Sequence, residues 1–168
     1  MMNTPVPATP LAQAEDFCDA MALLPAALTI VTTTDDEGRR WGFTASSVVS
    51  VSLDPPLLLV GLSHTSSCHE AFVSAREFVV NVLDDRHRTL AHTFARHGVD
   101  RFAGQEFGRW PGTGLPVLPD AHAAYRCLRY DVLPAGDHEL LLGALAEVEA
   151  GPPGAPLLWF RRTFHTPR

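Results

Sequence analysis

Small hydroxyl-bearing side chains gather in one stretch of the chain where bulky residues would normally pack in a strand. Residues 42–47 read Gly-Phe-Thr-Ala-Ser-Ser, and Ser50 and Ser52 follow before Pro55-Pro56. Small side chains let a planar ligand approach the backbone closely, and the hydroxyls and amides can hydrogen-bond a ring edge or a phosphate. Composition alone also fits a plainer interpretation, a Ser- and Thr-rich edge strand in contact with water.

Sequence motifs of several common catalytic and nucleotide-binding sites are absent. The chain has no GxGxxG fingerprint after a strand, no GxxxxGK[ST] phosphate loop and no GxSxG nucleophile elbow. His69-Glu70 has no second histidine at position 73, so HExxH is missing too. One expected helix contains His87, His92 and His97, each five residues from the next. This spacing turns neighbouring side chains about 140° from each other, so they cannot share a metal ion. His64 and His69 have the same spacing. We expect no catalytic metal.

Charge and cysteine usage narrow the class of protein further. The net charge of -6 argues against a nucleic-acid partner, which usually meets a basic face. An anionic ligand would therefore be held locally, by backbone amides, hydroxyls and a few arginines. Cys18, Cys68 and Cys127 are too few and too widely spaced for a disulfide framework or a CxxC metal knuckle. Reduced thiols are typical of a cytoplasmic protein.

No segment reads as a membrane span or a signal peptide. The apolar runs stay well short of the roughly 18 residues that a membrane helix needs. The first residues carry neither a basic nor an apolar signal region, so residues 1–10 are predicted to be a disordered leader before one domain at 11–168.

The pattern of the remaining chain favours an antiparallel β fold. Runs rich in apolar and β-branched residues predict strands at 27–34, 41–53, 57–63, 77–83, 122–133, 138–150 and 157–164, the first two as a hairpin. Helices are expected at 11–24, at 67–75 with Ser66 or Ser67 as cap, and at 86–98 with Asp84 or Asp85 as cap and Gly98 as its end. Residues 98–121 read as a long loop. Three helices are too few for alternating βαβ units, so we expect a barrel.

Residues 42–63 resemble the flavin-binding stretch of the flavin reductase-like, FMN-binding split-barrel family, which contains the reductase components of two-component flavin monooxygenases. The resemblance extends from about Ala20 to Phe164, and later landmarks occur in the same order as in that family. They are residues 65–67, 77–83, 94–95, 100–102 and 136–138. The implied fold is mainly β, an antiparallel split β-barrel with a few peripheral helices.

The resemblance also implies an activity and a set of site residues. The implied enzyme is an NAD(P)H-dependent flavin reductase, a homodimer that reduces FMN or FAD with NADH or NADPH and passes reduced flavin to a monooxygenase. The implied flavin contacts are Thr44, Ala45, Ser46, Ser47, Gly61, Leu62 and Ser63 around the ring and ribityl chain, Ser66 and Ser67 at the phosphate, and Phe94, Ala95, Arg96, Arg101 and Phe102 closing the phosphate side.

The resemblance implies that Gly136, Asp137 and His138 are further cofactor contacts, and that His138 contacts and orients the nicotinamide. Hydride transfer between two ring systems depends first on orientation, so no obligatory acid is assigned. Two other functions stay open: a flavoprotein that retains its flavin and catalyses another redox step in a biosynthetic pathway, and a non-catalytic flavin-binding protein.

Overall fold

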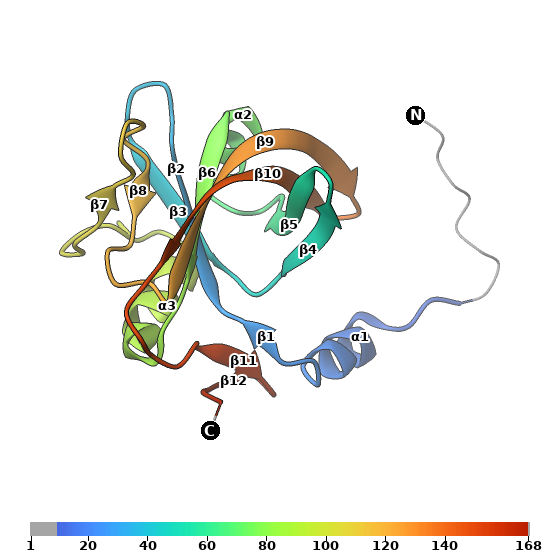
Figure 1. Cartoon of the computed structure of the whole chain (residues 1–168). Helices are drawn as coiled ribbons and strands as arrows, with labels where there is room; N and C mark the ends of the chain where they lie inside the picture. The colour runs from blue at the N-terminus through green and yellow to red at the C-terminus, as the bar shows by residue number, and fades with distance from the viewer. Residues whose placement is uncertain (1–9, 168) are drawn as a thin grey trace.

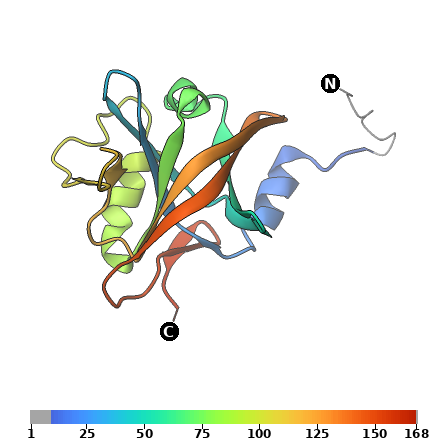
Figure 2. The same cartoon turned by 45° about the horizontal axis from the view of Figure 1, so that its top comes forward.

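The structure, a computed structural model, describes residues 10–167 and is built on one seven-stranded antiparallel sheet. Nearly all of the predicted leader at 1–10 lies outside the described residues. In spatial order the strands are β3 (Arg40–Ala45), β2 (Thr29–Thr34), β6 (Glu77–Val82), β9 (Ala123–Ala135), β10 (His138–Ala150), β5 (Pro56–Ser63) and β4 (Val48–Leu53). Figures 1 and 2 show this sheet curling on itself, with the helices outside it. The predicted antiparallel β-barrel is confirmed.

The two outermost strands of the sheet are joined by a link of only two residues. β3 pairs with β2 as the predicted hairpin, whereas β4 pairs with β5 at the opposite end of the sheet. Ser46 and Ser47 alone lie between β3 and β4, and the Gly61 amide donates to the Ser47 carbonyl at 3.2 Å. The prediction of one continuous strand at 41–53 is therefore wrong, because the chain changes partner strands at these serines. This change of partner brings the sheet's two ends together and leaves a split in the barrel wall.

The helices are shorter than the sequence pattern predicts. They are α1 (Ala14–Met21), α2 (His69–Ser74) and α3 (Arg88–Ala95), the last preceded by a short 3-10 turn η1 (Asp85–His87). Asp84 caps η1 as predicted, but the helix ends at Ala95 rather than near Gly98, because Arg96 is extended. The predicted serine cap of α2 is wrong, since Cys68 occupies that position. Within residues 10–167, no helix is long and apolar enough to cross a membrane.

The predicted loop at 98–121 is ordered against the barrel. It forms a small hairpin of β7 (Gly108–Arg109) and β8 (Pro116–Val117) and buries Trp110 almost completely. Asn81, buried in β6, accepts a hydrogen bond from the Leu118 amide at 2.8 Å, and Thr32 donates to the Pro116 carbonyl at 2.6 Å. Both bonds fix this segment to the outside of the sheet.

The C-terminal segment forms a second, three-stranded sheet of β1 (Ala26–Ala27), β11 (Leu158–Phe160) and β12 (Thr163–His165). The predicted single strand at 157–164 is wrong, because Arg161 and Arg162 adopt φ values of 49° and 59° and reverse the chain between β11 and β12. The Arg161 amide donates to the Ala22 carbonyl, and Arg162 pairs with Asp19. These contacts link α1 to the C-terminal hairpin.

Both faces of β2 are buried, which explains its unbroken run of β-branched residues. Val31 belongs to the barrel interior with Val60, Leu62 and Phe72, while Ile30 points the other way into a cluster beneath α3. Successive side chains of a strand alternate between faces, so two cores can share one strand. The outer core packs α3 firmly against β2 and β3.

Candidate functional site

A cavity of about 340 Å³ opens at the split in the barrel. Its wall comes from the end of β3, the Ser46–Ser47 link, the end of β5, the loop after β5, the end of α3 and the start of β10. Cavities of about 300–1,000 Å³ commonly hold small molecules and cofactors. The break between the two end strands thus produces the concavity.

Most of the predicted site residues meet in this cavity. Its lining includes Thr44, Ala45, Ser46, Ser47, Gly61, Leu62, Ser63, Ser66, Phe94, Ala95, Arg101 and His138. Ser67 and Phe102 instead line an adjoining hollow of about 580 Å³, into which Arg101 also projects. Arg96, Gly136 and Asp137 line neither, although the Arg96 carbonyl accepts from Arg101 and Asp137 contacts His138.

Glycine at position 61 preserves space in the cavity wall. A Cβ on Gly61 would lie 2.8 Å from Ser47 Oγ and 3.9 Å from His138 Cδ2. Even alanine would displace the serine hydroxyl, while its Cβ would stay in ordinary contact with the histidine. Gly61 therefore lets the Ser46–Ser47 link approach β5 with its hydroxyls at the cavity.

Two close contacts hold α3 at the cavity. The Thr44 hydroxyl donates to the Ala91 carbonyl of α3 at 2.7 Å. Gly42 of β3 leaves room for Phe94, whose Cε1 would be 2.8 Å from an added Cβ. The flavin contact of Thr44 stays a prediction, whereas its hydroxyl ties β3 to α3 in the structure.

Arg101 is a buried cation without a carboxylate partner among residues 10–167. Its guanidinium donates to the Gly42 carbonyl at 2.9 Å, to Cys68 Sγ at 2.9 Å and to the Arg96 carbonyl at 3.0 and 2.7 Å. None of the ion pairs among the described residues includes Arg101, although Arg101 is only 9% exposed. Buried charges are costly unless they are paired. The position of Arg101 between the two hollows therefore suits an anion.

The Ser66 and Ser67 region differs in detail from a plain helix cap. The Ser66 hydroxyl accepts a hydrogen bond from the Cys68 amide at 3.3 Å, and Ser63 Oγ lies 3.0 Å from Thr65 Oγ1. Ser66 faces the cavity with Arg101, whereas Ser67 faces the adjoining hollow. Arg101 lines both of these hollows, and both serines also line a third hollow beside α2.

His138 is placed at the rim of the cavity by a tight turn. Gly136 and Asp137 alone separate β9 from β10, and Gly136 adopts a φ of 64°, which glycine tolerates best. The Asp137 carboxylate lies 2.7 Å from His138 Nδ1, and this hydrogen bond lowers the pKa of Asp137. The contact fixes the ring while leaving Nε2 available for another partner.

Sequence reasoning missed several lining residues. Phe43, Thr65 and His97 also face the cavity, and Arg39, Arg40 and Cys68 line the adjoining hollow. Phe43 lies within residues 42–47 and Thr65 within residues 65–67, two stretches that carry the family resemblance. Their position in these stretches is the sequence signal that could have identified them. Arg39 ends a charged Asp- and Gly-containing segment, residues 35–39, that is typical of a turn, and nothing in the sequence near Arg39 or Arg40 marks them as facing a site.

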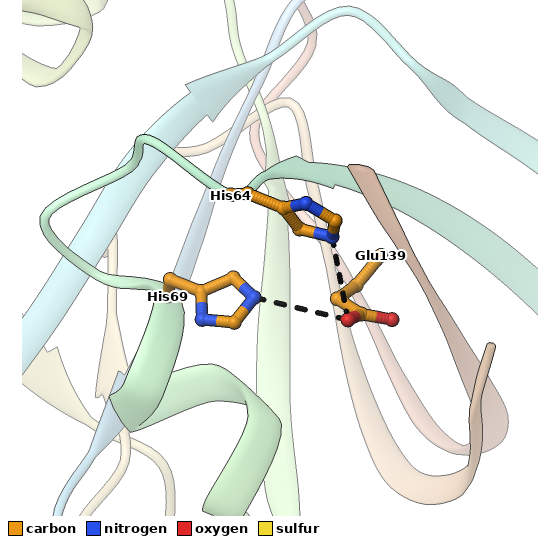
Figure 3. Close-up of side chains that lie close together, drawn as sticks. All are labelled: His64, His69 and Glu139. Carbon is orange, nitrogen blue, oxygen red and sulfur yellow. Dashed lines mark ion pairs between the residues drawn. The ribbon is translucent and has the colours of Figure 1, made fainter. Parts of the chain in front are cut away.

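A second cluster forms on the other side of β10. His64, His69 and Glu139 bring one ligand atom each to within 4.8 Å of the others (Figure 3). The expectation that a five-residue spacing separates His64 from His69 is wrong, because His64 precedes α2 and the intervening residues form a turn instead of a helix. The absence of a catalytic metal stays a prediction.

Comparison with known proteins gives consistent matches over most of the chain. A family model described as "Flavin reductase like domain" matches residues 21–168. The chain is 55% identical over 162 residues to an NADH:riboflavin 5'-phosphate oxidoreductase of Streptomyces pristinaespiralis, covering 96% of this chain and 92% of that protein. It is 37% identical over 150 residues to the reductase component of a flavin-dependent trigonelline monooxygenase of Acinetobacter baylyi, covering 89% of this chain and 47% of that protein.

A solved structure of a related enzyme has the same fold as this chain. The NADH:FAD oxidoreductase SgcE6 of Streptomyces globisporus, solved with NAD and FAD fragments, superposes with a TM-score of 0.84 at 27% identity, covering 94% of this chain and 96% of that one.

Proposed function

Since the chain belongs to the flavin reductase-like domain family, we propose that it is an NADH:FMN oxidoreductase that delivers reduced flavin to a separate monooxygenase. Its relatives include both an NADH:FMN enzyme and the reductase component of a monooxygenase, which supports the two halves of the proposal. The expected compartment is the cytoplasm, where NADH is available.

The observation that carries the proposal is the buried Arg101 cation beside an open, hydroxyl-lined cavity. A flavin phosphate would supply the anion that Arg101 lacks, with Ser66 and Ser67 as further hydrogen-bond donors. The ring and ribityl chain would lie along residues 44–47 and 61–63, where small side chains leave room. Phe94 and Ala95 of α3 would close one side.

The protein's part in the reaction is binding and orientation. Hydride transfer from the nicotinamide to the flavin is chemistry that the two ring systems supply themselves. His138, fixed by Asp137 at the rim, orients the nicotinamide against the cavity. The apolar wall formed by Phe43, Leu62 and Phe94 excludes water from that side. No side-chain nucleophile is required, in keeping with the absence of nucleophile motifs from the sequence.

We also propose that the protein acts as a homodimer. β4, at one end of the sheet order, exposes Val49, Val51 and Leu53, the last by 90%. α1 buries none of its residues and exposes Phe17 and Met21. Apolar surface of this kind is stabilised when a partner covers it.

The decisive experiment is an NADH oxidation assay with excess free FMN. The proposed enzyme oxidises NADH with many turnovers per chain and requires added flavin. Parallel assays with FAD, riboflavin and NADPH define substrate preference. A protein that purifies with tightly bound flavin and leaves free FMN unreduced would contradict the proposal and favour a flavoprotein that retains its flavin.

A further inference from the structure

His64, His69 and Glu139 come from three separate elements and converge on one point. His64 lies in the loop after β5, His69 begins α2, and Glu139 is the second residue of β10. Glu139 Oε1 lies 3.4 Å from His64 Nε2 and 3.9 Å from His69 Nε2 (Figure 3). The two imidazole rings meet edge to face, with their centroids 5.4 Å apart.

The three ligand atoms lie outside the lining of the flavin cavity, although Ser66 lines both that cavity and the hollow at the two histidines. Neighbouring residues of a strand point to opposite faces, so His138 faces the flavin cavity and Glu139 the other side of β10. Both histidines line a different hollow of about 410 Å³, open to solvent beside α2. That hollow is also lined by Asp35 and Glu70 and by no arginine or lysine. Its charge therefore favours a cation.

A hydrogen-bonded ion pair does not account for all three groups. His69 Nε2 is buried and has no hydrogen-bond partner among the described residues, because Glu139 is slightly too far away. One protonated histidine would be enough to pair Glu139 and would leave the other imidazole unsatisfied. A metal ion bound by all three groups would satisfy both nitrogens and the carboxylate together.

We propose that His64, His69 and Glu139 bind a divalent transition metal of the zinc class. Two imidazole nitrogens and one carboxylate, with an open fourth position for water, form a common zinc ligand set. Ligand atoms on a tetrahedral zinc ion are about 3.4 Å apart, given bonds of about 2.1 Å. The His64–Glu139 distance already has this value. His69 would have to move closer, since its Nε2 lies 3.9 Å from Glu139 and the three ligand atoms now lie within 4.8 Å of one another.

The site would cross-link the loop after β5 to the start of β10. The His64 amide already donates to the Asp137 carbonyl at 3.0 Å, so the cluster lies behind the turn that carries His138. A bound metal would hold α2, this loop and β10 together. Such a cross-link is independent of whether the chain reduces flavin.

The test uses the full chain without a histidine tag, with Cys18→Ser as the parent because that exposed thiol could bind metal itself. After chelator treatment, Zn²⁺ is titrated calorimetrically and Co²⁺ is added as a spectroscopic probe. We expect one Zn²⁺ per chain, visible Co²⁺ bands of a four- or five-coordinate site, and a higher melting temperature with Zn²⁺.

Three variants and one matched control locate the ligands. His64→Gln, His69→Gln and Glu139→Gln should each weaken Zn²⁺ binding by roughly tenfold or more and abolish the Co²⁺ bands. His92→Gln, at an exposed histidine of α3, should bind as the parent does. The proposal is overturned if the parent binds no Zn²⁺ below the millimolar range, or if all three variants bind it as well as the parent. Even if a variant fails to fold, the Zn²⁺ titration of the parent shows whether the chain binds zinc below the millimolar range.

Discussion

At the scale of single residues, the buried guanidinium of Arg101 gives the sharpest prediction. Arg101→Gln removes the charge that a flavin phosphate would neutralise, so the FMN dissociation constant should rise by about ten- to a hundredfold. Riboflavin has no phosphate and should bind nearly as before. Fluorescence titrations of both flavins measure the difference.

Arg101→Lys is the matched control, because it keeps the charge and loses the planar fork. Arg101→Lys should raise the FMN dissociation constant less than Arg101→Gln does. Equal weakening of FMN and riboflavin in Arg101→Gln would mean that Arg101 only holds the Gly42 and Arg96 carbonyls in place.

His138 gives a prediction that separates the two substrates. His138→Ala should lower kcat/KM for NADH by about ten- to a hundredfold while the FMN dissociation constant stays nearly unchanged. Steady-state kinetics in NADH and flavin titration are made on the same preparation, with His92→Ala as a control of equal chemistry at an exposed helix position. An unchanged kcat/KM in a folded, flavin-binding variant would remove His138 from the nicotinamide site.

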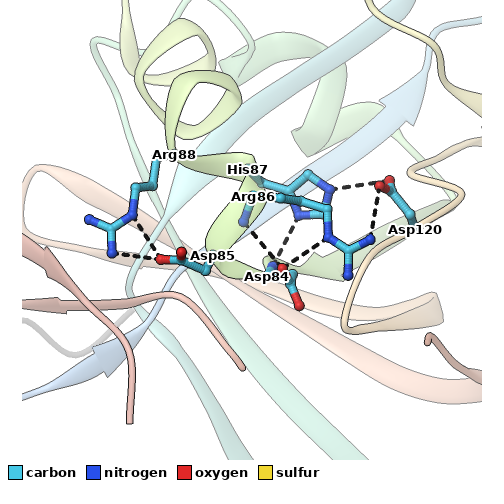
Figure 4. A network of polar contacts seen from close by, with 6 residues as sticks. All are labelled: Asp84, Asp85, Arg86, His87, Arg88 and Asp120. Atoms are coloured by element: carbon cyan, nitrogen blue, oxygen red, sulfur yellow. Dashed lines mark hydrogen bonds and ion pairs between the residues drawn. The ribbon is translucent and has the colours of Figure 1, made fainter. Parts of the chain in front are cut away.

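At the scale of elements, the start of η1 depends on one buried carboxylate. Asp84 accepts hydrogen bonds from the Arg86 amide and side chain, while the Asp84 amide donates to His87 Nδ1 (Figure 4). The Arg86 side-chain bond lowers the pKa of Asp84 from 3.8 to about 2. A depressed carboxyl pKa stabilises the fold fully above about pH 4, and that stabilisation is lost as the pH falls through 2.

Asp84→Asn should therefore lower the free energy of unfolding by about 2 kcal/mol at pH 7. The difference between wild type and variant should shrink as the pH falls from 5 to 2. Urea unfolding at a series of pH values measures both. A difference that stays constant over that range would show that the charge of Asp84 is not what stabilises the cap.

The long β9–β10 pair depends on a glycine at a bulge. The register of β10 shifts between Leu142 and Gly143, and a Cβ on Gly143 would lie 2.6 Å from Phe78 Cζ and 2.8 Å from Cys127 Cβ. Gly143→Ala should overpack the barrel interior and destabilise it by about 1–3 kcal/mol. Gly108→Ala, whose nearest neighbours are 3.6 Å away, is the control and should change little. Equal melting temperatures for the two variants would contradict the packing argument.

At the scale of the whole molecule, the exposed side of β4 predicts self-association. Light scattering at micromolar concentration should give about twice the chain mass of 18.3 kDa. Val51→Glu should shift the protein to the monomer, because it places a charge among exposed apolar residues. Ala103→Glu, at an exposed site elsewhere, should leave the mass unchanged. A monomeric wild-type protein would reject the dimer.

The overall architecture and most of the site were within reach of the sequence. β-branched and apolar runs with tight turns predict the barrel. The cavity residues follow from the family resemblance, because on composition alone the small hydroxyl residues at 42–47 also fit an edge strand in contact with water. The break at Ser46-Ser47 could not be predicted from the sequence, because residues 41–53 carry a continuous strand pattern. Only the pairing of β3 with β2 and of β4 with β5 separates the two strands. The Arg161-Arg162 reversal was missed because neither residue is one that commonly adopts positive φ.

The split in the barrel also bears on how long a bound molecule stays. The cavity is bordered by a two-residue link, a loop and a helix end, and the Gly61–Ser47 hydrogen bond joins the link to β5. Widening this border requires local motion and leaves the seven-stranded ladder intact. Residence time can then be short even in a very stable protein, which suits the proposed delivery of reduced flavin to a second protein before it meets oxygen.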